Sequence, residues 1–254
     1  MKERILLMGP PGSGKSEQLI NVASYIQELK IPMYAIDLED KLSAMLENRD
    51  DAPENIKLHV TLSWDEPENK RYRGFKQTCE EILVKSNPGD WIAIDRLDLA
   101  WPFVQRWFTQ EKYKESLADK LIQTSKAMTK KSMFIPRFDQ GSWQVINEQY
   151  ESTVNRLIFD SRCNILITTG IKGVEQDSPL DIGRYGVLPR GQKELGHQPH
   201  SVFLLTQEKE TGSRKWDWFI STDKDLKKRT YFDKEPLFDF GMQYLSNYYN
   251  PNDR

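Results

Sequence analysis

The sequence is poor in the residues that build disulfide frameworks and metal sites. It has two cysteines, Cys79 and Cys163, and three histidines in 254 residues. Two cysteines this far apart give no disulfide framework, and neither residue type shows the close spacing of a zinc site. These absences argue against a disulfide-stabilised secreted scaffold and against a zinc-binding module. They are typical of a protein of the reducing cytoplasm, which is the location we expect.

Long apolar runs and a charge excess are also missing. No apolar stretch approaches the roughly 18 residues of a membrane-spanning helix, so we expect no membrane contact. The first residues run directly into an apolar segment that begins at about residue 4, so we expect neither a signal peptide nor an extra N-terminal domain. Lysine and arginine number 36 against 38 acidic residues, a net charge of −2. This balance indicates no polyanion partner, although a local basic stripe is enough to bind one.

A complete phosphate-binding motif stands near the N-terminus. It matches G-x-x-x-x-G-K-[ST] with the residues Gly9, Pro10, Pro11, Gly12, Ser13, Gly14, Lys15 and Ser16. An apolar run at residues 5–8 precedes it and a helical apolar pattern at residues 19–29 follows, the strand–loop–helix context that the motif needs. Glycines let backbone N–H groups turn toward phosphates, Lys15 would reach the β- and γ-phosphates, and Ser16 would ligate Mg²⁺. The sequence therefore predicts that the chain binds a nucleoside triphosphate together with Mg²⁺; the motif does not distinguish ATP from GTP.

Strands and helices alternate along the rest of the chain. We expect strands at residues 33–38, 56–62, 91–95, 164–168, 200–205 and 216–222, a charged loop at 64–73, and helices at 75–83 and 143–160. A helical, aromatic and Lys-rich segment covers about 97–135, a mobile Gly-rich loop covers about 172–199, and an aromatic tail at 231–249 should fold back onto the core. This order predicts one three-layer α/β domain over residues 1–254, with a mostly parallel central sheet and a C-terminal antiparallel hairpin.

Acidic residues end two of the predicted strands, where an α/β sheet binds its ligand. Asp95 closes an apolar strand, as expected of a Walker B aspartate that holds the magnesium site. Many P-loop ATPases place the base that orients the attacking water directly after this aspartate, but here the next residue is Arg96. The base must then come from elsewhere. Glu39 is the candidate for this base, and Asp98 is a weaker competitor for the same role. The alternative is that Glu39 is only a solvated acid in a loop.

The segment Ile36-Asp37-Leu38-Glu39 resembles a motif of the RecA-like recombination ATPases, whose second strand ends in Ile-Asp-x-Glu at the same interval from the P-loop lysine. The resemblance implies a RecA-like P-loop fold, with Glu39 as general base and Asp95 as the Mg²⁺ aspartate. It places Thr168 or Thr169 where the family senses the γ-phosphate, although the family often has Gln there. The chain looks closest to short phage-encoded RecA-core ATPases that work beside single-strand binding or annealing proteins.

The same resemblance implies partners. RecA-like proteins keep a DNA-binding loop after the sensor strand, and the loop here offers cations and one aromatic platform: Lys172, Arg184, Tyr185, Arg190 and Lys193. Lysines near the next-to-last strand reach the γ-phosphate of a neighbouring subunit in that family, which makes Lys224 a candidate catalytic cation. These features imply single-stranded DNA and a homo-oligomer, ring or filament. The alternatives without function are that the Gly-rich loop makes no DNA contact and that Lys224 lies in a solvated basic turn.

The leading interpretation is therefore a Mg²⁺-dependent ATPase of RecA type that binds single-stranded DNA and assists homologous recombination or strand annealing. Three others remain open. A nucleoside monophosphate kinase would share the P-loop, but no clear arginine-rich lid follows. A phage DNA-packaging or remodelling motor usually has Asp-Glu where this chain has Asp95-Arg96. A nucleotide switch would bind ATP without hydrolysing it.

Overall fold

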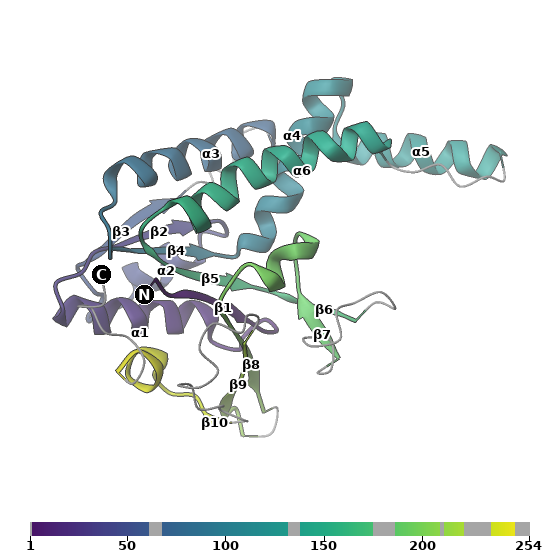
Figure 1. The fold of residues 1–254 in the computed structure, drawn as a ribbon. Helices are drawn as coiled ribbons and strands as arrows, with labels where there is room; N and C mark the ends of the chain where they lie inside the picture. Colours follow the sequence, from purple (N-terminus) through teal and green to yellow (C-terminus); the bar gives the residue numbers. More distant parts are fainter. Residues whose placement is uncertain are drawn as a thin grey trace.

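A computed structural model describes residues 2–60, 68–131, 138–174, 186–208, 211–220 and 235–246 of the chain (Figure 1). The strands are β1 (Arg4–Met8), β2 (Met33–Asp37), β3 (Ile56–Val60), β4 (Trp91–Asp95), β5 (Asn164–Thr169), β6 (Ile171–Gly173), β7 (Val187–Pro189), β8 (Ser201–Gln207), β9 (Arg214–Ile220) and β10 (Glu235–Pro236). The α-helices are α1 (Lys15–Glu28), α2 (Lys41–Glu47), α3 (Glu68–Lys85), α4 (Ala100–Tyr113), α5 (Leu117–Lys131) and α6 (Gln140–Asn155). None of these helices combines the length and apolarity needed to cross a bilayer.

Eight of the described strands form one sheet in the order β10-β9-β8-β1-β5-β4-β2-β3. From β8 to β3 every neighbouring pair is parallel, whereas β9 is antiparallel to both β8 and β10. A strand, β5, lies between β1, which leads into the phosphate-binding motif, and β4, which ends at Asp95. The predicted architecture, an α/β fold with a mostly parallel sheet and a C-terminal antiparallel hairpin, is confirmed.

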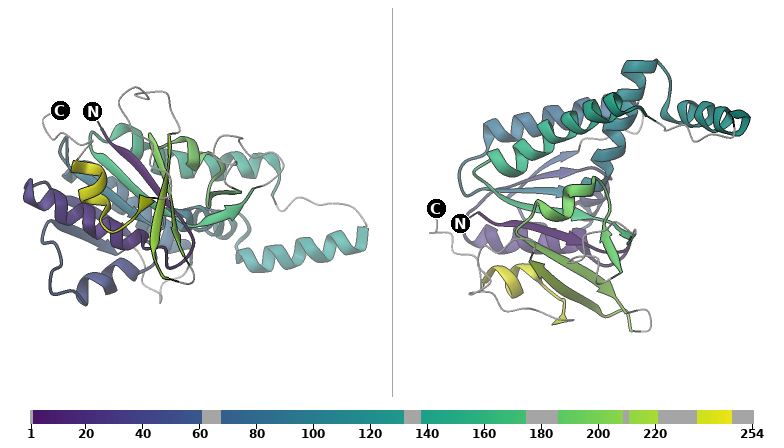
Figure 2. Two further views of the ribbon diagram at one scale, coloured as in Figure 1. Left: turned by 90° about the horizontal axis from the view of Figure 1, so that it is seen from below. Right: turned by 45° about the vertical axis from the view of Figure 1, so that its right-hand side comes forward.

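The sheet is the middle of three layers (Figure 2). Side chains on β1 alternate between the faces: Leu6 and Met8 join the core beneath α3, α4 and α6, whereas Ile5 and Leu7 join the core with α1 and the C-terminal segment. All four are fully buried. Because both faces of the central strands are covered, these strands are continuous apolar runs rather than alternating ones.

The C-terminal segment packs beside α1, as predicted for the aromatic tail over its described part. The Phe240 backbone N–H donates to Oε1 of Gln18 at 2.8 Å, and the Phe240 ring lies edge-on to Phe203 with centroids 4.9 Å apart. A short π-helical turn, Gly241–Leu245, follows. A Cβ on Gly241 would lie 2.7 Å from the carbonyl oxygen of Asn21, so only glycine permits this approach.

Two expectations about local structure were wrong. Residues 68–73, expected in a charged loop, form the first turns of the 18-residue helix α3. The buried residues Tyr72, Phe75, Cys79 and Ile82 recur at helical spacing, and the charged residues between them favour helix. The segment after β5, expected to be loop to about residue 199, contains a small antiparallel pair, β6 and β7, and a short 3-10 helix at Lys193–His197; residues 175–185 lie outside the described part.

The aromatic segment after β4 forms α4 and α5. Phe103 and Phe108 of α4 are buried, which confirms that its aromatic residues pack as a helical face. Helix α5 projects away from the sheet (Figures 1 and 2), and its Leu121 and Ile122 are exposed. Lys120 at its start lies over the Tyr113 ring, with Nζ 3.9 Å from the centroid.

Candidate active site

The phosphate-binding motif forms the turn between β1 and α1, and two of its glycines are required by conformation. Gly12 and Gly14 have φ of +80° and +89°, the left-handed region that side chains disfavour. A Cβ on Gly9 would lie 2.3 Å from the carbonyl oxygen of Leu205. The loop is therefore held tightly against β8, with the N-terminus of α1 beneath it.

Lys15 points back into this loop. Its Nζ donates to the carbonyl oxygens of Gly9 at 2.9 Å and Pro10 at 2.8 Å, and to Oγ of Ser13 at 3.3 Å. The residue is 8% exposed, and burial, reinforced by the positive charge of Arg96, lowers its pKa to about 8. The ammonium group therefore lies inside the curl of the loop, where the motif is expected to receive phosphate oxygens.

The register of the sheet brings the predicted strand-end residues together. Asp37 lies beside Asp95, and because Ile94 pairs with Ile167, Thr168 follows next to Asp95 on the other side. Oγ of Ser16 donates to Oδ2 of Asp95 at 2.9 Å, and the Thr168 hydroxyl donates to Oδ1.

Asp95 is fully buried, and this burial raises the pKa of its carboxyl group against the opposing effect of the Thr168 and Ser16 hydrogen bonds. A serine hydroxyl and a carboxylate oxygen in contact at the mouth of a P-loop are the hard oxygen donors that Mg²⁺ prefers. Ser16 and Asp95, the predicted metal residues, therefore fit that ion.

Asp37 supports the turn that presents Glu39. One of its carboxylate oxygens accepts the Glu39 backbone N–H at 3.0 Å and the other accepts the Ser43 N–H at 2.9 Å. Two backbone donors at the start of α2 are satisfied in this way. Asp37 thus fixes the backbone of the turn, and the Glu39 side chain is left to face the space above the phosphate-binding loop.

Glu39 forms an ion pair that the sequence did not reveal. Its Oε1 accepts from Nη1 of Arg96 at 2.8 Å, and the same guanidinium binds Asp98 through Nε at 2.9 Å and Nη2 at 3.1 Å. Glu39 is 35% exposed and Asp98 only 1%. Asp98, the competing base, thus turns both oxygens to Arg96, whereas Glu39 is open to the cavity.

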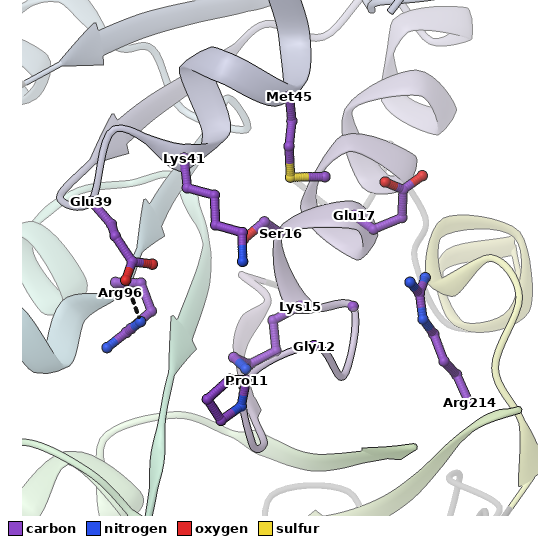
Figure 3. A pocket seen from close by; sticks show the side chains of 11 residues that line it. Pro11, Gly12, Lys15, Ser16, Glu17, Glu39, Lys41, Met45, Arg96 and Arg214 are labelled. Carbon is purple, nitrogen blue, oxygen red and sulfur yellow. Dashed lines mark hydrogen bonds and ion pairs between the residues drawn. The ribbon is translucent and has the colours of Figure 1, made fainter. Parts of the chain in front are cut away.

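Lys15, Ser16, Glu39 and Arg96 line a cavity of about 290 Å³ (Figure 3), whereas Asp95 and Thr168 lie behind its wall and are not part of it. Its wall consists of Pro11, Gly12, Gly14, Lys15, Ser16, Glu17, Glu39, Lys41, Met45, Arg96 and Arg214. Of these, Glu17, Lys41, Met45 and Arg214 lie outside the predicted motifs and were not predicted. Lys41 and Met45 belong to α2, the short helix whose first turn Asp37 caps by accepting the Ser43 N–H. Their closeness in sequence to the predicted base was the only feature that could have predicted them as site residues. Nothing near Arg214 in the sequence indicated a place in the site.

The end of β5 is tied to the segment that follows it. Thr168 also accepts the Arg96 backbone N–H at 2.9 Å, and the Thr169 hydroxyl donates to the carbonyl oxygen of Arg190 at 2.8 Å. Gly170 and Arg190 are joined by a backbone hydrogen bond of 2.8 Å. Three other predicted residues, Arg184, Tyr185 and Lys224, lie outside the described part of the chain.

No protein-family model and no curated protein matches the sequence. Among solved structures, the chain is similar to the crystal structure of the RadB recombinase, with a TM-score of 0.46 and 12% sequence identity over 87% of this chain and 82% of that chain. A similarity this distant carries no inference about activity. The residues at the strand ends are what indicate a function for this chain.

Proposed function

We propose that the chain is a Mg²⁺-dependent ATPase of RecA type, built as one domain, that binds single-stranded DNA and assists homologous recombination or strand annealing. One observation carries the proposal. The phosphate-binding loop, the contact between Ser16 and Asp95, and the open carboxylate of Glu39 all lie at one edge of the sheet around one cavity. A P-loop, a pair of metal donors and a base are the parts that ATP hydrolysis requires.

Each residue then has a definite task. The loop backbone and Lys15 bind the β- and γ-phosphates, and Ser16 and Asp95 hold Mg²⁺, which when bound neutralises phosphate charge. Glu39 takes a proton from a water molecule as the water oxygen bonds to the γ-phosphorus and the bond from that phosphorus to ADP breaks. The products are ADP and inorganic phosphate. Thr168 contacts Asp95 and the Arg96 backbone, so it holds the metal residue and the base partner in register.

Steady-state ATP hydrolysis with and without single-stranded DNA tests this function. We expect DNA to stimulate turnover and Glu39→Gln to lower kcat by roughly 10²- to 10⁴-fold, the contribution of a general base. Binding of ATP should persist in this variant and disappear in Lys15→Ala. Glu54→Gln is the matched control, because Glu54 is an exposed acid away from the cavity and its change should leave kcat unaltered.

Other outcomes identify the alternatives. Hydrolysis that ignores DNA, or that Glu39→Gln leaves intact, contradicts the RecA-type mechanism. Transfer of phosphate to an added nucleoside monophosphate would reveal a kinase instead. Binding of ATP with no turnover under any condition would reveal a nucleotide switch.

The DNA and assembly parts of the proposal need their own measurement. The basic loop around β6 and β7 supports DNA contact, since Lys172, Arg190 and Lys193 flank residues 175–185. Fluorescence anisotropy with labelled single strands should show affinity that falls with salt, and replacing these cations by alanine should reduce the salt slope. If Lys224 acts on a neighbouring subunit, Lys224→Ala should abolish DNA-stimulated turnover without preventing assembly, measured by mass photometry. An accompanying single-strand binding or annealing protein is the expected partner.

A further inference from the structure

Arg214 lies beside the phosphate-binding loop although it is far from it in the sequence. It begins β9 and pairs with Gln207 at the end of β8, which is itself the neighbour of β1. The hairpin of β8 and β9 therefore lies beside β1, the strand that leads into the phosphate-binding loop. A Cβ on Gly12 would lie 3.5 Å from Oε1 of Gln207, so the hairpin end and the loop are in contact.

The guanidinium of Arg214 reaches the N-terminus of α1. Its Cδ, Nε and Nη1 all lie 3.0 Å from the point that a Cβ on Gly14 would occupy. Since Gly14 also has a positive φ, a side chain is doubly excluded there, and the arginine fills the space. Arg214 is part of the cavity wall, on the opposite side of the loop from Glu39 and Arg96 (Figure 3).

Arg214 has no counter-charge in the described part of the chain, whereas Arg96 and Glu17 of the same wall each have one. Arg96 binds two carboxylates, and Glu17 is paired with Arg49 at 2.6 Å. No carboxylate in the described part of the chain pairs with Arg214. A guanidinium held at the positive end of a helix without an anion is unfavourable, and a phosphate group supplies that anion with two parallel hydrogen bonds.

Its position indicates which phosphate it binds. Water must attack on the side of Glu39, so the γ-phosphate lies toward Glu39 and the phosphates nearer the nucleoside lie away from it. We infer that Arg214 binds the α- or β-phosphate from within the same chain, and that it sets how tightly ATP and ADP are both held rather than how fast ATP is hydrolysed. This inference rests on the proposed function, since it assigns a binding residue to the same site.

Equilibrium binding of ADP and of a non-hydrolysable ATP analogue tests the assignment. Arg214→Ala should weaken both by a similar factor, roughly 10- to 100-fold for a hydrogen bond to a charged group, with kcat at saturating ATP within about twofold of wild type. Arg214→Lys keeps the charge but loses the planar arrangement of donors, so its nucleotide affinity should lie between those of wild type and Arg214→Ala. Lys215→Ala is the matched control, because Lys215 is the next residue of the strand and pairs with Glu208 instead.

Each other result overturns the inference in a distinguishable way. Unchanged affinity in Arg214→Ala, with binding lost in Lys15→Ala, means that Arg214 does not touch the nucleotide. Normal ADP affinity with weakened analogue binding and a reduced kcat places Arg214 at the γ-phosphate instead. A wild-type chain that binds neither nucleotide overturns the proposed function and this inference together. Thermal melting without nucleotide should be the same for Arg214→Lys and wild type, which excludes misfolding as the cause.

Discussion

Arg96 joins the carboxylate of Glu39 to that of Asp98, with Nη1 2.8 Å from the first and Nε 2.9 Å from the second. The residue that follows the Walker B-like aspartate is therefore a cation that contacts the candidate base. Its φ of +65° turns the side chain toward both carboxylates, and the two hydrogen bonds that it donates to Asp98 are the main reason that the pKa of Arg96 is raised. The pair with Asp98 is nearly solvent-free, whereas the pair with Glu39 opens to the cavity.

This difference predicts unequal stability losses. Arg96→Met keeps the aliphatic stem but leaves the buried Asp98 charge unpaired, which should lower the free energy of unfolding by about 3 kcal/mol. Glu39→Gln removes only a half-exposed partner and should cost less than about 1 kcal/mol. Urea denaturation followed by circular dichroism measures both.

The double variant Arg96→Met, Asp98→Ala separates charge from packing. Because it removes the unpaired carboxylate, it should recover part of the loss of Arg96→Met. If Arg96→Met and Glu39→Gln lowered the free energy of unfolding equally, water would solvate Asp98 well enough to replace the arginine.

Thr168 offers a functional test of the strand-end register. Thr168→Val keeps the shape but removes the hydroxyl that donates to Asp95 and accepts from the Arg96 backbone. Loss of a hydrogen bond to a charged group should reduce ATP turnover by roughly 10- to 100-fold. Thr168→Ser retains the hydroxyl and should retain most of the turnover, although it also loses a buried methyl group. Similar turnover in the two variants would assign Thr168 to packing alone.

The sequence was sufficient to predict the core of the site, because its signals are local. The P-loop spacing, the apolar strands and their terminal residues Asp37, Asp95 and Thr168 can be read directly. Their proximity then follows, since parallel strands end at one edge of the sheet. The extent of α3 was missed because its first turn is polar, and only Tyr72 shows that the core face begins there.

Side-chain partners across the fold could not be predicted in the same way. The pairing of Arg96 with Glu39 depends on a left-handed backbone at a non-glycine residue, a conformation that sequence patterns rarely signal. The place of Arg214 depends on β8 lying next to β1, a crossover between distant segments. Each needs the sheet order before the contact can be inferred.

Gly9 should be intolerant of even one added carbon. In Gly9→Ala the new Cβ would meet the Leu205 carbonyl oxygen at 2.3 Å and Oγ of Ser13 at 2.6 Å, so the loop or β8 must move. Overpacking of this kind costs about 1–3 kcal/mol, and ATP binding should weaken with it. Gly173→Ala is the control, because no atom of the described residues lies within 4 Å of its Cβ position and its φ is not in the left-handed region. A neutral Gly9→Ala in urea denaturation would mean that the loop separates easily from β8.

The two free cysteines report on the integrity of the core beneath α3, α4 and α6. Cys79 on α3 and Cys163 before β5 are each 1% exposed, and burial raises the pKa of both thiols. A raised pKa means less thiolate at a given pH, and the thiolate is the form that reacts. In the native protein at pH 8, neither thiol should react with a disulfide reagent over minutes, whereas both should react at once in denaturant. Cys79→Ala and Cys163→Ala identify the responsible thiol if one reacts early. Fast labelling of Cys79 in the native state would show that α3 opens from the sheet, which its buried face of Tyr72, Phe75 and Ile82 argues against.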